Sequence, residues 1–413
     1  MPGAELVPRR PWRGRRILLG VTGSIAAYKS IQLARDLTRL GAVVDVVLTD
    51  AAQQFVAPLS FEGVTGRRPL TDLFSAEGAA LHVRLGMEVD VVCVAPATAD
   101  FLARAAQGRA DDLLCTTLLA TRAPVVVCPA MNDRMFAHPQ VQENLTHLRD
   151  ELGYSIAGPA QGALAVGEGE GPGRMLEPAE IEEHIGRALG AGAPFLGRAV
   201  LVTAGPTREA FDPVRYIGNR SSGRMGYAVA QAAWRRGADV TLVSGPSSLE
   251  APVGVQVVKV ETAQEMYAAV AQHIGTADVT VFAAAVADYR PAEPRTDKLK
   301  RRQAGNDLAV ALEANPDIAE STTDARKPGS VTVGFALETS DLLANAVKKL
   351  EAKRFDLVVA NDATEEGAGF EVATNRVTVL TRDSEPVALP LLSKDEVAEE
   401  ILDRVGHLLE TPR

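Results

Sequence analysis

The chain has few cysteines and few aromatic residues, and each shortage excludes a class of protein. Its 413 residues include three cysteines, too few for a disulfide framework, so a reducing compartment is expected. Aromatic residues make up 5%, which disfavours a surface that stacks on single-stranded nucleic acid. The net charge of −10 argues against a protein that coats nucleic acid.

Long apolar runs are also lacking. Segments such as Val89–Ala97 and Val279–Ala287 have about half the ~20 residues of a membrane-spanning helix. Residues 9–16 are basic like the start of a signal peptide, but the apolar stretch Ile17–Val21 that follows is too short for one. We therefore expect a cytoplasmic protein in which residues 1–14 form a frayed tail.

The composition is that of a globular protein, with 46% hydrophobic and 23% charged residues over a length that favours two or three domains. A buried-strand pattern at 17–21, a helical pattern at 25–40 and a strand at 43–48 form one βαβ unit, and strands are expected at 89–94 and 124–128. The pattern restarts with a strand at 199–203, a helix at 226–236 and a strand at 239–243. These repeats predict an α/β fold with two Rossmann-like parallel-sheet domains, residues 15–190 and 197–413. Residues 158–173 carry too many glycines for a helix or a strand, which predicts a mobile loop or flap.

The first domain has a tight turn, Gly20–Ser24, between a strand and a helix. The turn matches neither Gly-x-Gly-x-x-Gly nor a Walker loop. Its backbone N–H groups suit an anion, yet an ordinary βα turn explains it equally well. Thr49 is a candidate phosphate ligand or merely a strand-end cap.

Three further residues follow expected strand ends or stand alone. Thr98 lies in Ala95–Asp100 and Asn132 in Pro129–Asn132, both placed where open α/β sheets bind ligands. His82 alone is more often structural than catalytic, and Asn132 alone is typical of a turn.

Together these segments resemble the flavin-dependent cysteine decarboxylases, in particular phosphopantothenoylcysteine decarboxylases. The resemblance covers about residues 15–185 and implies an FMN-binding fold in which Gly23, Ser24, Thr49 and Thr98 line the flavin. It also implies that His82 is the catalytic histidine and that Asn132 holds the substrate carboxylate. Oxidation of the substrate thiol by hydride transfer to FMN would supply the electron sink that decarboxylation needs.

One departure from that family concerns the acid that protonates the product. The family places a cysteine in an Ala-Cys-Gly sequence before Gly-x-Gly-Arg-Met, and here Val166 stands near that position before Gly171–Met175. Cys93, Cys115 and Cys128 lie elsewhere, in apolar segments, and are expected to be inert buried thiols. Glu168, Glu170 or water is then the candidate proton donor, or this half releases an oxidised ene-thiol.

The second domain carries several polar motifs. Ser221–Gly223 before a helix is a candidate phosphate cradle or a common helix cap. The cationic run from Lys298 to Arg302 is by itself more often solvated surface. Lys349 and Lys353 share a helix face, where an anion between them would relieve their repulsion.

In order along residues 197–405, these motifs resemble phosphopantothenate–cysteine ligases, whose bacterial members use CTP. The resemblance implies that Asn219 and Arg215 act at an acyl-cytidylate, that Lys298 serves both catalysis and nucleotide binding, and that Mg²⁺ takes part through ligands that the sequence does not identify. The remaining CTP-binding residues that it implies are Asp288, Asn315, Pro316, Asp317, Ile318, Phe335, Lys349 and Lys353.

Both resemblances together imply a bifunctional enzyme of coenzyme A biosynthesis. It would join cysteine to 4′-phosphopantothenate and then decarboxylate the product to 4′-phosphopantetheine, as a homo-oligomer with a dimeric ligase domain and a trimeric or dodecameric flavin domain. A ligase with an impaired or oxidative-only flavin half is the main alternative. An NAD(P)-dependent dehydrogenase lacks the glycine fingerprint, a peptide-oxidising flavoprotein leaves the second half unexplained, and a pure binding protein leaves Lys298, Asn219 and His82 unexplained.

Overall fold

The chain folds into two compact units, residues 1–191 and 192–413, each described by itself. The computed structural model describes residues 11–74, 80–164, 167, 169–190, 194–300, 308–338, 341–362, 372–382 and 384–410.

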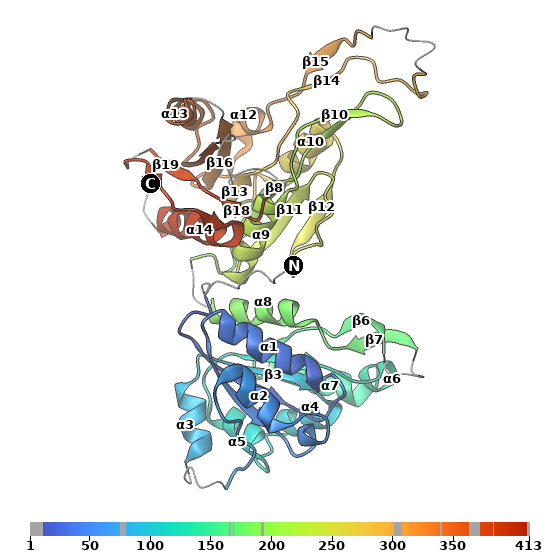
Figure 1. The fold of residues 1–413 in the computed structure, drawn as a ribbon, viewed down its shortest axis with the longest axis vertical. Coiled ribbons are helices and arrows are strands. Elements are labelled where there is room, and N and C mark those ends of the chain that lie inside the picture. Colours follow the sequence, from blue (N-terminus) through green and yellow to red (C-terminus); the bar gives the residue numbers. More distant parts are fainter. Residues whose placement is uncertain are drawn as a thin grey trace. The chain divides into compact units, whose positions relative to one another are not determined.

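The first unit is built on a five-stranded parallel sheet (Figure 1). In their spatial order the strands are β2 (Val43–Leu48), β1 (Arg16–Val21), β3 (Val91–Ala97), β4 (Val125–Pro129) and β5 (Ser155–Ile156). The chain runs from β1 outward to β2 and then returns to the other side of β1 for β3. The order therefore reverses between β1 and β3, and in open α/β sheets such a point leaves a crevice at the carboxyl ends of the strands.

Helices cover both faces of this sheet, so its strands read as nearly continuous apolar runs. One face carries α1 (Ala27–Arg39), α2 (Pro58–Thr65) and α8 (Pro178–Leu189). The other carries α3 (Leu81–Glu88), α4 (Ala99–Ala106), α5 (Leu113–Ala120) and α7 (Pro139–Asp150). The short η1 (Ala52–Gln54) and α6 (Asp133–Phe136) lie between these elements along the chain.

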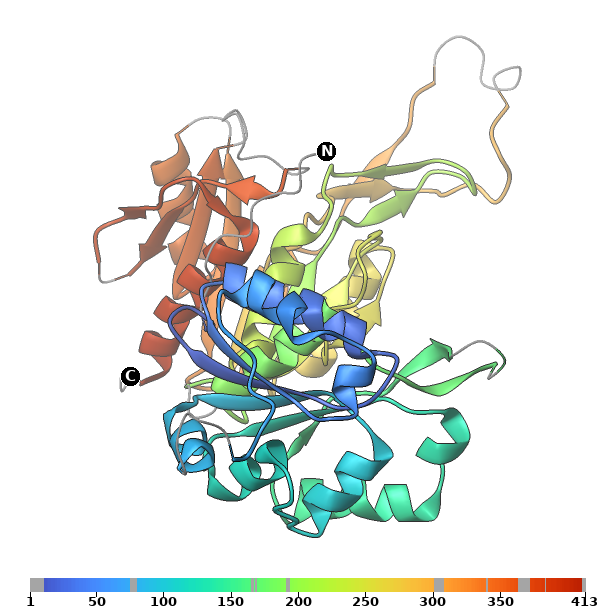
Figure 2. The ribbon, with the colours of Figure 1, turned by 60° about the horizontal axis from the view of Figure 1, so that its bottom comes forward.

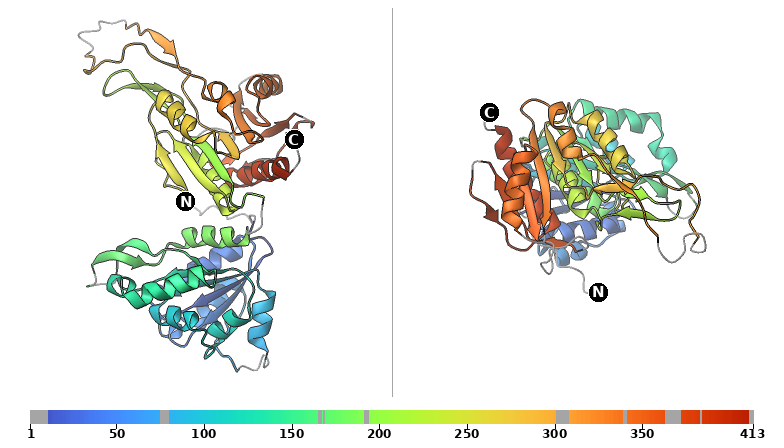
Figure 3. Two further views of the ribbon diagram at one scale, coloured as in Figure 1. Left: turned by 180° about the vertical axis from the view of Figure 1, so that it is seen from behind. Right: turned by 90° about the horizontal axis from the view of Figure 1, so that it is seen from above.

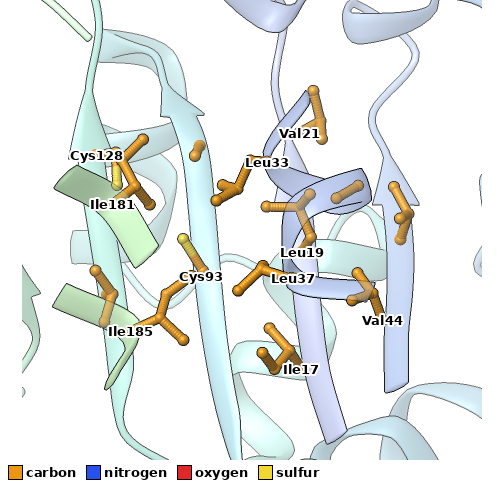
Figure 4. Close-up of a cluster of buried hydrophobic side chains, with 14 of the residues drawn as sticks. Ile17, Leu19, Val21, Leu33, Leu37, Val44, Cys93, Cys128, Ile181 and Ile185 are labelled. Atoms are coloured by element: carbon orange, nitrogen blue, oxygen red, sulfur yellow. The ribbon is translucent and has the colours of Figure 1, made fainter. Parts of the chain in front are cut away.

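The cysteines of this unit lie in its core. Figure 4 shows Cys93 and Cys128 among the side chains that β1, β3, β4, α1 and α8 contribute to one layer. A hydrogen bond between the two thiols, together with burial, raises the pKa of Cys128 well above its usual value. Burial raises the pKa of Cys115 to about 12. The prediction that all three thiols are buried is confirmed, and their inertness stays a prediction.

Two predictions about this unit are wrong. Residues 11–14 are not a frayed tail, because Trp12 is 1% exposed in the core and Gly14 N donates to Gly41 O; residues 1–10 lie outside the described ranges. Residues 158–173 were expected to contain no strand, but β6 (Ala160–Ala163) and β7 (Glu170–Arg174) pair as an antiparallel hairpin that reaches out from the sheet (Figure 2). Backbone hydrogen bonds hold such a ladder, and glycine forms them as well as any residue.

The second unit has an eight-stranded sheet. In spatial order its strands are β12 (Gln256–Lys259), β11 (Asp239–Ser244), β8 (Ala199–Ala204), β13 (Val279–Phe282), β16 (Val331–Glu338), β17 (Leu357–Asp362), β19 (Thr378–Thr381) and β20 (Val387–Ala388). The first six are parallel, and β19 and β20 extend the sheet antiparallel. The order of the parallel strands is that of a Rossmann fold, with its reversal between β8 and β13.

Two helical layers enclose this sheet as well. One face carries α9 (Arg224–Arg235) and α14 (Lys394–Glu410). The other carries α10 (Ala263–His273), α12 (Ile318–Ser321) and α13 (Leu342–Ala352), with η2 (Thr323–Ala325) after α12. The small pairs are β9 (Arg208–Ala210) with β10 (Tyr216–Gly218), β14 (Tyr289–Pro291) with β15 (Leu312–Ala314), and β18 (Thr374–Asn375) with β21 (Leu392–Ser393).

The pairs β9–β10 and β14–β15 project together from one end of the second sheet (Figure 3). None of the helices in the described ranges is both long and apolar enough to span a membrane. The α/β architecture with two Rossmann-like cores is as predicted; the antiparallel extension of the second sheet was not.

Two candidate active sites

A large cavity lies in the first unit, at the carboxyl ends of β1 to β4. Its volume is about 1190 Å³, enough for a ligand with a ring system and a phosphate tail. Its walls come from the turn after β1, the segments after β2, β3 and β4, and the β6–β7 hairpin. It includes the crevice between β1 and β3 that the strand order creates.

Two threonines join the strands at that crevice. Thr22 Oγ1 donates to Pro96 O over 2.8 Å, and Thr98 N donates to Thr22 Oγ1 over 3.1 Å. Thr98 also caps α4, because its Oγ1 accepts from Phe101 N at 3.3 Å. These bonds hold the loops after β1 and β3 together as one wall of the cavity.

The turn after β1 is shaped by Gly23. A Cβ at this position would lie 2.5 Å from Ala51 Cβ, so only glycine lets the turn pack against the segment after β2. Ser24 lies between this turn and the first residue of α1, and its Oγ accepts a hydrogen bond from Ala26 N at 3.2 Å. Thr49 lines the same part of the cavity and its Oγ1 accepts from Ala52 N. First-turn N–H groups of a helix and two hydroxyls thus border one region, which is a suitable place for a phosphate.

Asn132 lies on the opposite wall, after β4. Its Oδ1 accepts from Arg134 N at 2.9 Å and caps α6. The assigned orientation leaves the side-chain NH₂ as the group that can donate into the cavity, which suits a carboxylate.

The β6–β7 hairpin packs against the segment that carries Asn132. Met131 N donates to Gly173 O over 3.0 Å, and a Cβ on Gly173 would lie 2.2 Å from Met131 O. The base of the hairpin is therefore fixed by backbone contact beside Asn132. Val166 and Glu168 lie outside the described residues.

Of the residues predicted for the first site, Gly23, Ser24, Thr49, Thr98 and Asn132 line the cavity. His82 does not line it: it lies on α3, and its Nδ1 is buried with no hydrogen-bond partner among the residues that the structure describes. Glu170 is exposed and is likewise not among the lining residues.

Lys29 was not predicted as a site residue. This side chain is 7% exposed, lines the cavity, and donates from Nζ to Met175 O at 3.2 Å and to Glu177 Oε1 at 2.9 Å. It joins α1 to the chain that leaves the hairpin. Its place in the first turn of α1, the helix that follows the Gly23–Ser24 turn, was the available signal.

The second unit contains a smaller pocket of about 190 Å³ at the carboxyl ends of β8, β13 and β16. This volume suits one part of a nucleotide and not the whole. All but one of the CTP-binding residues that the resemblance implies line it: Asp288, Asn315, Pro316, Asp317, Ile318, Phe335, Lys349 and Lys353. The exception is Lys298, which is exposed outside the pocket.

The polar side chains of this pocket form hydrogen bonds and an ion pair with neighbouring residues. Asn315 Nδ2 donates to Ala287 O at 2.8 Å, and Lys349 Nζ donates to Phe335 O at 2.6 Å. Lys353 Nζ lies 2.5 Å from Asp317 Oδ2. Burial opposes ionisation of Asp317, but the hydrogen bonds from Lys353 and from the backbone of Glu320, together with the charges of Lys353 and Lys349, outweigh it and lower the pKa of this carboxyl. Two lysine side chains and one carboxylate therefore border the pocket.

Asn219, Arg215 and Lys298 were predicted to act at this site but do not line the pocket. Asn219 is next to it, because its Nδ2 donates over 2.8 Å to the carbonyl of Val286, a lining residue. Arg215 is instead bound to Asp212 and donates to Leu299 O at 2.8 Å. The Asp212 carboxylate also accepts from Leu299 N at 3.1 Å, so the pair clamps the residue that follows Lys298. The Arg215 guanidinium is the largest cause of a strongly lowered Asp212 pKa.

Several lining residues of the second pocket were not predicted. Thr203 is the penultimate residue of β8, so the strand-end rule could have found it. Phe282 and Phe355 form a tilted ring pair with centroids 5.7 Å apart, and both line the pocket. Both phenylalanines stand in apolar segments of the sequence, so nothing distinguished them from ordinary core residues. The turn Ser221–Gly223 begins α9 but is not among the residues that line this pocket.

No group of three or more His, Cys, Asp or Glu side chains placed to hold a metal ion occurs among the described residues.

Comparison with known proteins gives matches to both units. Residues 7–190 match the family described as Flavoprotein, and residues 195–408 match the family described as DNA/pantothenate metabolism flavoprotein C-terminal domain. The coenzyme A biosynthesis bifunctional protein CoaBC of Vibrio vulnificus is 46% identical over 399 residues, covering 96% of this chain and 98% of the relative.

Two solved structures are similar to single units. The crystal structure of the C-terminal domain of a CoaBC protein is 41% identical, covers 53% of this chain and 99% of its own, and has a TM-score of 0.45. That of the FMN-dependent cysteine decarboxylase SpaF is 37% identical, covers 43% and 97%, and has a TM-score of 0.37.

Proposed function

This chain belongs to the coenzyme A biosynthesis bifunctional (CoaBC) family and has ligase and decarboxylase activities, and we propose that its second unit performs the CTP-dependent ligation and its first unit the FMN-dependent decarboxylation. The family match extends over the whole length of the relative, so the alternative of a ligase with an impaired flavin half is not favoured. The observation that supports the assignment of sites is that each unit gathers most of its predicted ligand-binding residues at its own topological switch point.

The pocket of the second unit supports binding of CTP. Lys349 and Lys353 place two positive charges beside it, and Asn315 fixes its wall against the end of β13. The pocket takes one part of the nucleotide while the triphosphate reaches the ammonium groups. Mg²⁺ would then be carried by phosphate oxygens and water, as is usual for this ion.

The ligation proceeds in two steps. A carboxylate oxygen of 4′-phosphopantothenate attacks the α-phosphorus of CTP, and pyrophosphate leaves; the cysteine amine then attacks the acyl carbon, and CMP leaves. The lysine ammonium groups stabilise the charge on the departing pyrophosphate. Asn219 lies against Val286 at the pocket wall, where its amide can donate to charge that develops at the acyl group. Lys298 and Arg215 act from the exposed side of the same end of the sheet.

The cavity of the first unit fits FMN. Its volume admits an isoalloxazine ring, and Gly23 creates a turn that a Cβ would fill. Gly23, Ser24 and Thr49 would hold the phosphate, and Thr98 would border the ring at the β1–β3 crevice. The chemistry supplied by a bound flavin is the reversible acceptance of a hydride from the substrate.

The chain's own residues bind and orient the substrate there. Asn132 donates its NH₂ to the carboxylate that is lost, and the β6–β7 hairpin covers the reacting groups and limits the access of water. The proton that completes the saturated product comes from water or from Glu168 or Glu170 of that hairpin, because Val166 cannot donate one.

His82 does not line the cavity of its own chain, so it can act in this scheme only at the cavity of another copy of the chain. We therefore propose a homo-oligomer in which α3 of one copy completes the cavity of a neighbour. Mixing His82→Asn with Asn132→Leu chains tests this arrangement: decarboxylation returns in mixed oligomers if the two residues come from different copies, and it stays absent if they must come from the same chain. We also place the enzyme in the cytoplasm, where free thiols remain reduced.

The direct test is to incubate the purified protein with 4′-phosphopantothenate, cysteine, CTP and Mg²⁺ and to identify products by mass spectrometry. We expect 4′-phosphopantetheine and a flavin absorbance spectrum. Lys353→Met should abolish CTP-dependent pyrophosphate release, whereas Lys348→Met, on the exposed side of the same helix, should not. Accumulation of phosphopantothenoylcysteine, or of an ene-thiol two hydrogens lighter, would contradict the proposal for the first unit; equal rates for the two lysine variants would contradict it for the second.

A further inference from the structure

Arg326 lies directly behind the nucleotide pocket without lining it. It follows η2 and precedes β16, on the far side of the pocket wall. Its guanidinium donates from Nη1 to Lys353 O at 3.0 Å and Arg354 O at 3.1 Å, and from Nη2 to Ala319 O at 2.7 Å. One side chain thus holds the C-terminal carbonyls of α13 and a carbonyl of α12.

The segments that Arg326 joins carry the predicted nucleotide ligands. Lys353 is the C-cap residue that follows α13, and Ala319 follows the Asn315–Ile318 motif at the start of α12. The salt bridge between Asp317 and Lys353 connects the same two segments on the pocket side. Arg326 therefore joins the start of α12 to the end of α13 on the side away from the pocket, as the Asp317–Lys353 ion pair joins them on the pocket side.

The guanidinium also supports the aromatic part of the pocket. Its Cζ lies 5.9 Å from the centroid of the Phe282 ring and 5.6 Å from that of Phe355. Both rings line the pocket, so a planar cation packed behind them fixes their positions. Lysine lacks both the planar fork and the ability to stack in this way.

The guanidinium is held in a buried position. Its Nε is inaccessible to solvent and has no hydrogen-bond partner among the described residues, and burial lowers the pKa of the group from its usual value. Arginine still remains protonated, because its usual pKa is so high. A charged side chain in such a place is explained by the three carbonyls and two rings that it organises.

We propose that Arg326 is a positioning residue for nucleotide binding, which holds Lys353, the start of α12 and the Phe282–Phe355 pair in the arrangement that CTP requires. The proposal rests on the assignment of this pocket to CTP. Arg326 does not touch the nucleotide itself; it acts through the groups that do. A displacement of these groups by about 1 Å is enough to weaken a site about a hundredfold.

The test compares Arg326→Lys and Arg326→Met in the full-length protein with Arg354→Lys as the matched control. Arg354 belongs to the same segment, but its side chain is 70% exposed and its ion pair with Asp324 is at the surface. We expect the KM for CTP to rise about ten- to hundredfold in both Arg326 variants, with a smaller change in kcat and in the KM for cysteine. The control should match the parent chain.

A second measurement separates positioning from a general loss of stability. The CTP-induced rise in the melting temperature of the second unit reports binding without catalysis. We expect this rise to shrink in the Arg326 variants, and more in Arg326→Met than in Arg326→Lys. A fall in melting temperature and in kcat at an unchanged KM for CTP would overturn the inference, because that is the result of a merely structural residue. If CTP does not protect even the parent chain, the assignment of the pocket fails instead.

Discussion

Gly173 offers the sharpest test of how the flavin site is assembled, because its replacement by alanine should damage one activity and spare the other. A Cβ on Gly173 would lie 2.2 Å from Met131 O, about 1.2 Å closer than the 3.4 Å at which ordinary contact begins. The obstacle is backbone, so rotation of a side chain cannot relieve it. The hairpin or the segment with Asn132 must move by about 1 Å.

Such a shift should cost about 1–3 kcal/mol in packing and about a hundredfold in decarboxylase kcat/KM. The ligase activity of the same molecules should stay unchanged, since Gly173 belongs to the first unit. Both rates are measured on one preparation: pyrophosphate release for ligation, and carbon dioxide release from phosphopantothenoylcysteine for decarboxylation.

Two further alanine variants grade the effect. A Cβ on Gly171 would lie 2.8 Å from Asp133 Cβ, a milder overlap than the 2.2 Å at Gly173, so a smaller loss is expected for Gly171→Ala. Gly63→Ala is the control, because nothing lies within 4 Å of a Cβ there and alanine suits the helix α2. Equal decarboxylase rates in all three variants would refute the claim that backbone contact at Met131 positions Asn132.

Other consequences of the structure can be tested in the same protein. Asp212→Asn should lower ligase kcat/KM by about tenfold or more at unchanged decarboxylase activity, because the clamp on Leu299 is weakened and Lys298 loses its fixed backbone. Burial, and to a smaller extent the nearby charge of Arg187, lower the pKa of His184 to about 4. Between about pH 6.5 and pH 4 this histidine is therefore protonated in the unfolded chain but not in the folded chain. Stability of the first unit should therefore fall by about 3 kcal/mol as the pH drops through that range, and His184→Gln should remove that part of the loss in urea titrations. The three cysteine thiols should not react with a thiol reagent at pH 8 until the protein is unfolded; rapid labelling of the folded chain would contradict their inert role.

The parallel cores were predictable because their strands and helices have clear local signals. The stretch Ile17–Val21 is apolar on both faces and Gly41 ends the helix that follows, so β1, α1 and β2 appear within a residue or two of the expected bounds. Site residues that directly follow such strands, Thr98 and Asn132 among them, were predictable for the same reason: parallel strands bring their carboxyl ends to one edge.

Elements that depend on distant contacts were not predictable in this way. The strands of the β6–β7 hairpin were not predicted, because composition cannot show a contact such as that of Gly173 with Met131. Trp12 was assigned to a tail because only the folded chain places it in the core. Motif resemblance named His82 and Arg215, but it carries no geometry; the structure finds one on α3 away from the cavity and the other clamped by Asp212.

The two units also show why fold alone does not decide function. Both have a switch point between parallel strands, and both close it with a threonine, Thr22 in one and Thr203 in the other, that accepts a backbone N–H from the loop across the crevice. What differs lies outside the shared core. In the first unit a glycine-rich hairpin encloses a cavity large enough for a flavin, whereas in the second two lysines and an aromatic pair border a small pocket held from behind by Arg326. The chemistry of each unit therefore follows from segments beyond the common strands, and substitutions there should separate the two activities while leaving both folds intact.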